Sequence, residues 1–185
     1  MPKQVLAELD RKMNATLEDL KQDLSSLRTG RAAPSLVERI TIDYYGAQTP
    51  LSQVANVTVP DARQLLITPW DKSVAGQIAN VISKSDLGVQ AVRDGDAVRV
   101  SVPALNEERR KEMVKLAGKK TEEHKVALRN IRRDANDQLK KLEKEGGMTK
   151  DDLQREEGSV QKITDKFIAE AEKIRAAKEQ EIMEV

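Results

Sequence analysis

The sequence of 185 residues contains no cysteine, one histidine and only 2% aromatic residues. The absence of cysteine excludes disulfide bonds and thiolate metal sites, and it favours a reducing compartment. No apolar run approaches the roughly 20 residues that a membrane-spanning helix needs. The N-terminal segment is charged and amphipathic, which excludes a signal peptide. We therefore expect a soluble cytoplasmic protein that has no membrane partner.

Charged residues make up 34% of the chain, a composition typical of long solvated helices with narrow apolar seams. The net charge of +1 hides a segregation of charge along the sequence. Residues 106–144 carry 13 basic and 8 acidic side chains, whereas residues 145–185 carry 7 basic and 11 acidic ones. The two segments are expected to pack together and to leave one positive side on the molecule.

Three amphipathic helices are predicted. The first spans the N-terminal 30 residues, where apolar residues recur every three or four positions, and it should end near Gly30. The second begins at the N-cap Asn106 and runs to about residue 145, before Gly146 and Gly147. A capping box at residues 149–152 starts the third, which continues to the C-terminus. Since none of the three can bury its apolar stripe alone, residues 1–30 and 105–185 are predicted to form a three-helix bundle.

Residues 31–104 have a different pattern, with short β-branched runs separated by Gly and Pro. Strands are predicted at residues 39–45, 54–59, 65–68 and 97–102, with a helix at 73–85 and Trp70 in the core. The predicted fold class is α+β, an elongated three-helix bundle with an inserted small α/β (β-rich) sandwich domain. Two connectors would form a hinge between the domains, at about residues 30–31 and 103–105. The hinge residues are Gly30, Arg31, Pro103, Ala104 and Leu105.

The residue inventory argues against an enzyme. The sequence lacks a glycine-rich phosphate loop, and its carboxylates lie at helical spacings typical of surface ion pairs. The single histidine, His124, is expected to pack in the bundle or lie on its surface rather than bind a ligand. We therefore predict no catalytic residues, no metal site and no cofactor.

The most informative cluster lies on the second long helix. At 100° per residue, Leu128, Ile131 and Ala135 share one side, and a basic group is expected on the other side. This group comprises Lys125, Arg129, Arg132, Arg133, Asn136 and Lys140. Arginine binds phosphate in a bidentate manner, so three arginines within five residues favour RNA contact over an ordinary solvated face.

Two further arginine pairs could support RNA contact. Arg28 and Arg31 flank Gly30, while Arg109 and Arg110 lie in the first turn of the second helix, where an external anion would offset the positive end of the helix dipole. The few aromatic rings argue against a base-stacking platform for single strands. Recognition of the backbone and shape of folded RNA fits better, and no DNA partner is expected.

Five separated motifs resemble the bacterial ribosome recycling factor family. They are RTGRAAPS at residues 28–35, DYYG at 43–46 followed by TPL at 49–51, SDLG at 85–88, EERRK at 107–111 and RNIRRDAN at 129–136. The motifs occur in family order with family-like spacing and span the whole chain.

The resemblance implies an L-shaped molecule that acts after translation termination, with elongation factor G and GTP, to split the ribosome into subunits. It implies that the bundle docks on large-subunit ribosomal RNA near the peptidyl-transferase region. Arg129, Arg132 and Arg133 would be the main contacts, and Arg28, Arg31, Arg109 and Arg110 would support them. The partners expected on this basis are the large ribosomal subunit with its RNA, and elongation factor G, for a monomeric protein.

Two alternatives remain open from the sequence. A coiled-coil adaptor would use the apolar seams to bind partner helices, and it would oligomerise and ignore RNA. A ribosome-stalling or hibernation factor would bind the ribosome in a similar way but protect it from splitting.

Overall fold

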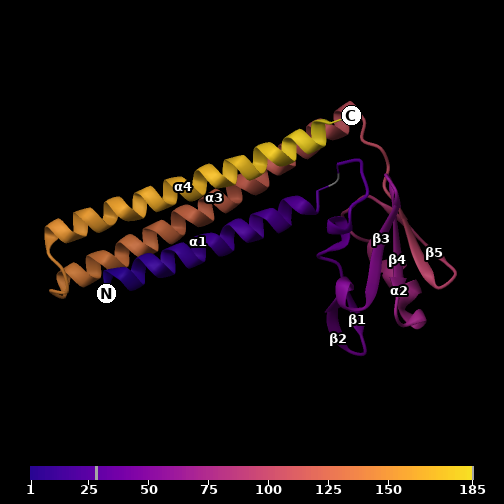
Figure 1. The fold of residues 1–185 in the computed structure, drawn as a ribbon, viewed down its shortest axis with the longest axis horizontal. Helices are drawn as coiled ribbons and strands as arrows, with labels where there is room; N and C mark the ends of the chain where they lie inside the picture. Colours follow the sequence, from indigo (N-terminus) through magenta and orange to yellow (C-terminus); the bar gives the residue numbers. More distant parts are fainter. Residues whose placement is uncertain (28, 185) are drawn as a thin grey trace. The chain divides into compact units, whose positions relative to one another are not determined.

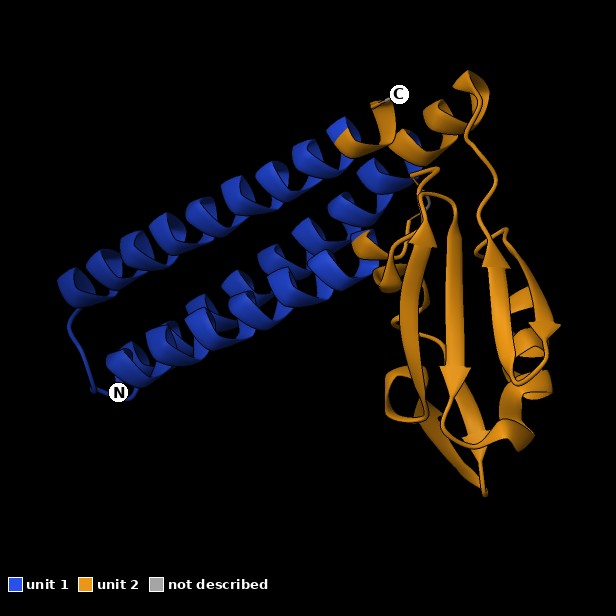
Figure 2. Cartoon of the chain, turned by 45° about the vertical axis from the view of Figure 1, so that its right-hand side comes forward, with its two compact units in different colours: residues 1–24, 115–180 blue, residues 25–114, 181–185 orange. Residues whose placement is uncertain are grey.

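The computed structural model describes residues 1–27 and 29–184. The chain divides into two compact units, which Figure 2 colours separately. Unit 1 contains residues 1–24 and 115–180, and unit 2 contains residues 25–114 and 181–185. Long helices form unit 1 and a small sheet domain forms most of unit 2, so the predicted α+β fold class is confirmed (Figure 1).

Unit 1 contains most of the helices α1 (Pro2–Ser25), α3 (Glu107–Lys144) and α4 (Lys150–Met183), which lie side by side (Figures 1 and 2). Residues 107–114 of α3 and 181–183 of α4 belong to unit 2. The predicted apolar stripe of α1 is buried, although the helix ends five residues before Gly30. Its buried residues are Val5, Leu9, Met13, Leu17, Leu20 and Leu24. Helix α3 contributes Ala117, Thr121, His124, Leu128, Ala135 and Leu139, and α4 contributes Val160, Thr164, Phe167 and Ala171.

Local capping explains where the two longest helices begin. The side-chain oxygen of Asn106 accepts a hydrogen bond from the backbone N–H of Arg109 at 2.7 Å, which caps α3. At the start of α4, the Thr149 hydroxyl accepts from the N–H of Asp152 at 3.1 Å, and the Asp152 carboxylate accepts from the N–H of Thr149 at 3.3 Å. This reciprocal pair is the predicted capping box.

Besides its parts of α3 and α4, the described part of unit 2 contains two antiparallel sheets, one shorter α-helix and three short 3-10 helices at Pro34–Val37, Leu51–Gln53 and Lys72–Val74. The strands β1 (Thr41–Tyr44) and β2 (Ala47–Pro50) form a hairpin. The second sheet has the order β3-β4-β6-β5, with β3 at Ala55–Asp61, β4 at Gln64–Pro69, β5 at Gln90–Asp94 and β6 at Ala97–Ser101. Helix α2 (Ala75–Ser83) contacts β5, β6 and β1, and its buried Ile78 and Ile82 join the core.

The number of strands differs from the prediction. The segments predicted as strands contain β1, β3, β4 and β6, whereas β2 and β5 were not expected. No residue of β2 or β5 is buried, so neither strand shows the apolar alternation by which a sequence reveals a strand. Both strands are instead held by main-chain pairing with a neighbour, β2 with β1 and β5 with β6.

The prediction that Trp70 lies in the core is wrong. Its side chain is 69% exposed, because Trp70 follows the alternation of β4, in which Leu65, Ile67 and Pro69 point into the core. The next position on the strand therefore faces outward. The core of unit 2 consists of aliphatic side chains, including Leu65, Ile67, Ile78, Ile82, Val98 and Val100.

Candidate nucleic-acid interface

The candidate interface is the α3 face that contains Arg129, Arg132 and Arg133. Arg133 is exposed, and Arg129 and Arg132 are partly exposed. Nη1 of Arg129 lies 3.2 Å from Oε1 of Glu122, and both side chains remain substantially exposed. Within residues 1–27 and 29–184, Arg132 and Arg133 form no ion pair or side-chain hydrogen bond. The guanidinium groups of these two residues are therefore free to bind an external anion.

Helical geometry explains the different environments along this face. Arg133 lies about 140° from Leu128 around the helix axis, whereas Arg132, four residues after Leu128, lies only about 40° away. The Arg132 stem therefore runs along the edge of the buried stripe, which is typical of long cationic side chains that keep the charged head in water. None of its nitrogen atoms is buried without a partner in the described structure.

Lys125 does not belong to the exposed basic face, contrary to the sequence prediction. Its side chain is 13% exposed and forms an ion pair with Glu172 of α4. The Lys125 ammonium, as the largest cause, holds the pKa of Glu172 below its ordinary value of 4.5, and Arg175 adds to this effect. Lys125 therefore links two helices of the bundle and is not available to bind RNA.

The remaining candidate arginines belong to unit 2. Arg31 is exposed, and Arg109 is exposed and lies 3.3 Å from the carboxylate of Glu112. Arg110 is partly buried, and its Nε has no hydrogen-bond partner among the described residues. Arg28 lies outside the described residues.

His124 packs inside the bundle, where it is 8% exposed. Packing in the bundle is one of the two positions expected from the sequence, the other being the surface. Its Nδ1 donates to the Lys120 carbonyl oxygen at 2.7 Å, and its Nε2 lies 3.1 Å from Oδ2 of Asp19. Lys120 in turn lies 3.4 Å from Asp23. The Nδ1 bond stays within α3, whereas the Nε2 contact with Asp19 and the pair of Lys120 with Asp23 link α3 to α1. Across residues 1–27 and 29–184, no group of three or more histidine, aspartate or glutamate side chains could hold a metal ion.

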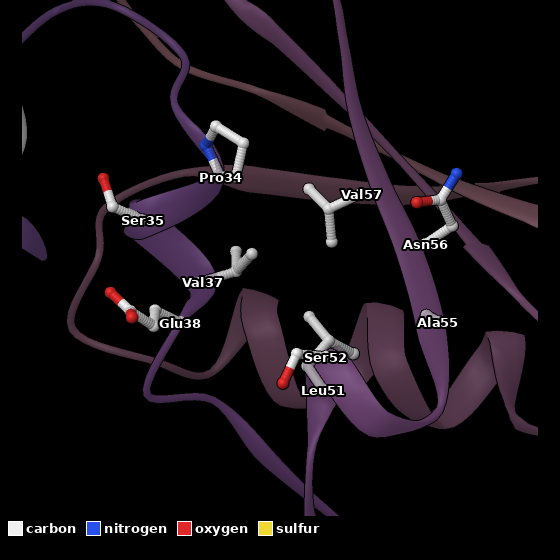
Figure 3. A pocket seen from close by; sticks show the side chains of 9 residues that line it. All are labelled: Pro34, Ser35, Val37, Glu38, Leu51, Ser52, Ala55, Asn56 and Val57. Atoms are coloured by element: carbon white, nitrogen blue, oxygen red, sulfur yellow. The ribbon is translucent and has the colours of Figure 1, made fainter.

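A hollow of about 390 Å³ in unit 2 has walls that are mostly apolar (Figure 3). It is lined by Pro34, Ser35, Val37, Glu38, Leu51, Ser52, Ala55, Asn56 and Val57. Glu38 is the only charged lining residue, and no histidine or lysine is present that could activate Ser35 or Ser52. No helix within the described part of the chain is both long and apolar enough to cross a bilayer.

Taken together, the three long helices and the small sheet domain define an α+β protein, and the arginines on α3 that lack a partner among the described residues form a candidate anion-binding face. Residues 20–183 match the family described as Ribosome recycling factor. The chain therefore belongs to the ribosome recycling factor family, whose members are translation factors that act in ribosome recycling after termination of protein synthesis.

Similar proteins cover the whole chain. The ribosome-recycling factor of Brevibacillus brevis is 54% identical over 185 residues, with full coverage of both chains. The factor of Francisella philomiragia is 53% identical over 181 residues, which is 98% of each chain. The factor of Bacillus subtilis is 49% identical over 185 residues, again with full coverage of both.

Two solved structures are also similar. The solution structure of a ribosome recycling factor has a TM-score of 0.77 and 37% identity, and the match covers 100% of this chain and 98% of that one. The second is a T. thermophilus ribosome recycling factor, which is bound with E. coli elongation factor G to the E. coli post-termination complex. It has a TM-score of 0.67 and 45% identity, with 100% of both chains covered.

Proposed function

We propose that this protein binds the large ribosomal subunit after termination and, together with elongation factor G and GTP, splits the ribosome into subunits. Membership of the ribosome recycling factor family supports this function. The similar T. thermophilus factor, which occurs with elongation factor G on a post-termination complex, supports the choice of partners.

The observation that carries the RNA-binding part of the proposal is the lack of intramolecular partners for Arg132 and Arg133 among the described residues. Arginine side chains on a helix of net basic charge tend to recruit anions, and ribosomal RNA offers phosphates at regular spacing. Arg129 would join them by exchanging its exposed contact with Glu122 for a phosphate, since a surface ion pair contributes little stability. Arg28, Arg31, Arg109 and Arg110 would provide supporting contacts.

The sheet domain would move relative to the helical bundle during splitting. The proposed hinge consists of Gly30 and Arg31 in one connector and Pro103, Ala104 and Leu105 in the other. All five residues belong to the compact unit 2, where they lie in the sequence between the strands and the long helices. Gly30 has a φ of +83°, and a Cβ atom at this position would lie 3.2 Å from the backbone nitrogen of Leu105. Glycine is therefore the residue that this connector requires.

The protein would act as a cytoplasmic monomer, without a cofactor and without hydrolysing a substrate itself. Elongation factor G would supply GTP hydrolysis, and this chain would contribute binding and displacement.

The decisive experiment is a subunit-splitting assay on post-termination ribosomes with elongation factor G and GTP. We expect the protein to increase the rate of splitting and the R132A/R133A variant to lose most of this effect. A matched double variant, Lys162→Ala with Lys166→Ala, removes two exposed cations from α4 and should behave like the parent. Protection of ribosomes from splitting would instead identify a hibernation factor.

Light scattering and co-sedimentation separate the proposal from the adaptor alternative. A monomer that co-sediments with large subunits supports ribosome binding. An oligomer that does not co-sediment with ribosomes would refute it.

A further inference from the structure

The hairpin between β1 and β2 ends in an unusual turn. Tyr44 pairs with Ala47, so Tyr45 and Gly46 form a two-residue loop, and both have positive φ angles, 51° and 86°. Two positive φ angles are typical of a type I′ turn, whose first position favours Asn, Asp or Gly. Tyr45 is the one non-glycine residue with positive φ in the described part of the chain. A bulky side chain at this position is strained, which is a feature found at functional sites.

The Tyr45 ring is exposed and also held in place. Its exposed fraction is 84%. The ring packs edge to face against Tyr44, with 4.6 Å between centroids and 73° between planes. Its hydroxyl donates to Oδ2 of Asp71 at 3.1 Å, and the Tyr44 hydroxyl reaches the same oxygen at 3.5 Å. An aromatic ring that is already ordered loses little entropy when a partner binds.

Asp71 connects the turn to the start of the segment that leads into α2. Its Oδ1 accepts from the hydroxyl of Ser73 at 2.7 Å and from the backbone N–H of Ser73 at 3.0 Å. Both bonds lower the pKa of Asp71, and the bond from the Ser73 hydroxyl has the larger effect. The tyrosine hydroxyls lower this pKa further. Most acceptor positions of this carboxylate are thus occupied. It therefore acts on a partner mainly through its negative charge and by orienting the tyrosine rings.

The surrounding charges make the turn negative. Lys72, the neighbour of Asp71, lies 3.4 Å from Asp96, so its charge is compensated. Asp43, next to Tyr44, is exposed, and its carboxylate has no partner among the described residues. An electron-rich ring in a negative field attracts a cation to its face, whereas it repels the phosphates of RNA. The chemistry of this turn is thus opposite to that of the α3 arginines.

We propose that the Tyr45 turn, formed by Tyr44, Tyr45 and Asp71, is a docking point for an arginine or lysine side chain of a partner protein. The cation lies on the exposed face of the Tyr45 ring, and Asp71 holds that ring in position. This contact is separate from the proposed binding of ribosomal RNA by α3.

The test uses Trp70, the only tryptophan of the chain and the sequence neighbour of Asp71, as a fluorescent reporter. Because Trp70 is 69% exposed, its emission responds to a ligand that binds beside it. The full-length protein is titrated with a nona-arginine peptide at constant ionic strength. We expect a saturable change in Trp70 fluorescence. Tyr45→Asn should weaken the apparent affinity by about tenfold through loss of the cation–π contact. Asn suits the turn, so this variant is expected to fold.

A second pair of variants separates the site from general charge attraction. Asp71→Asn should weaken the peptide several-fold, whereas Asp86→Asn, which removes an exposed carboxylate elsewhere in unit 2, should leave the affinity nearly unchanged. Equal effects of these two variants, or the absence of a saturable change, would overturn the proposal. A Tyr45-dependent change caused by oligouridylate would assign the turn to RNA instead.

Self-association is the remaining outcome. If Trp70 emission changes with protein concentration alone, and R132A/R133A abolishes this change, the occupant is a second copy and the partner-protein proposal fails. Failure of this docking proposal, by any of these outcomes, does not affect the proposed recycling function, because the splitting assay measures that function independently.

Discussion

At the scale of single residues, the availability of a cation on α3 depends on what the neighbouring helix places opposite it. Lys125 and Arg132 both lie within about 60° of the buried Leu128 around the helix axis. Glu172 of α4 forms an ion pair with Lys125, whereas no carboxylate among the described residues forms one with Arg132. The α3 sequence alone cannot distinguish the two, because the difference depends on the register between α3 and α4.

Arg132→Ala should weaken binding to large ribosomal subunits and change the free energy of unfolding by less than about 0.5 kcal/mol, since no ion pair or side-chain hydrogen bond is lost. Leu128→Ala should show the reverse pattern. Leu128 is fully buried, and its truncation should cost about 2–5 kcal/mol. Urea unfolding and co-sedimentation measure the two effects. Strong destabilisation by Arg132→Ala would contradict the assignment of this side chain to binding.

Glu172→Gln should make stability less dependent on pH. The pKa of Glu172 is lowered in the folded protein, so the carboxylate stabilises the fold above its ordinary pKa of 4.5, and this contribution disappears as the pH falls through the lowered value. The partly exposed pair is screened by solvent, so the variant should lose only about 0.5–1 kcal/mol at neutral pH.

The measurement for Glu172→Gln is urea unfolding of parent and variant at neutral pH and at several values below 4.5. The difference between the two proteins should shrink as the pH falls. Glu170→Gln, at an exposed pair with Lys173, serves as the control and should show a smaller difference. A difference in the free energy of unfolding that grows as the pH falls would contradict the lowered pKa of Glu172.

At the scale of helices and strands, the sequence predicts those elements that have local signals. Caps and apolar periodicity correctly placed α3 and α4, because Asn106 and Thr149 act within one turn of the chain. The strands β2 and β5 could not be predicted, since their stability comes from pairing with β1 and β6 rather than from their own apolar pattern. The exposure of Trp70 depends in the same way on the face of β4 that the sheet buries.

Asn106→Ala should lower the free energy of unfolding by about 1 kcal/mol, because the N–H of Arg109 loses its acceptor. Asn106→Gly should cost only a few tenths of a kcal/mol, since glycine is tolerated at an N-cap. Thermal unfolding of the two variants provides the comparison. Equal losses would show that the side-chain cap is not the origin of the effect.

Gly30→Ala should destabilise unit 2 more than Gly46→Ala does. Both glycines have positive φ angles, but a Cβ atom at Gly30 would meet the Leu105 backbone, whereas Gly46 has open space around it. The shared strain costs about 1–2 kcal/mol, and the contact adds to it only at Gly30. Chemical unfolding measures the free energy of unfolding of both variants, and the difference between them gives the effect of the contact with Leu105. A larger loss at Gly46 would contradict the connector argument.

At the scale of the whole molecule, the balanced net charge of +1 conceals two surfaces of opposite character. We expect the α3 arginines to attract phosphate and the Tyr45 turn to attract cations. Their counterparts on a ribosome would be RNA and a basic protein. The sequence suggested the first surface through arginine spacing, but it could not reveal the second, because Asp71 lies 26 residues from Tyr45 in the chain.

Ribosome binding should weaken steeply as salt rises, because phosphate contacts release counterions. Each removed arginine that contacts phosphate should reduce the slope of log affinity against log salt by roughly one unit. Binding to large subunits across a salt series, with Arg132→Ala and Arg133→Ala, tests this. A flat response would argue against phosphate contacts, while Lys166→Ala should retain the parental slope.

The contacts that join α1 to α3 also constrain how the chain is made. His124 meets Asp19 across 105 residues, and Lys120 meets Asp23 across 97. Closing so long a loop is slow, whereas β3 and β4 are neighbours in the sequence and can pair as soon as both have emerged. The sheet unit is therefore expected to acquire structure during synthesis, while the first helix waits for its partners until most of the polypeptide has been translated.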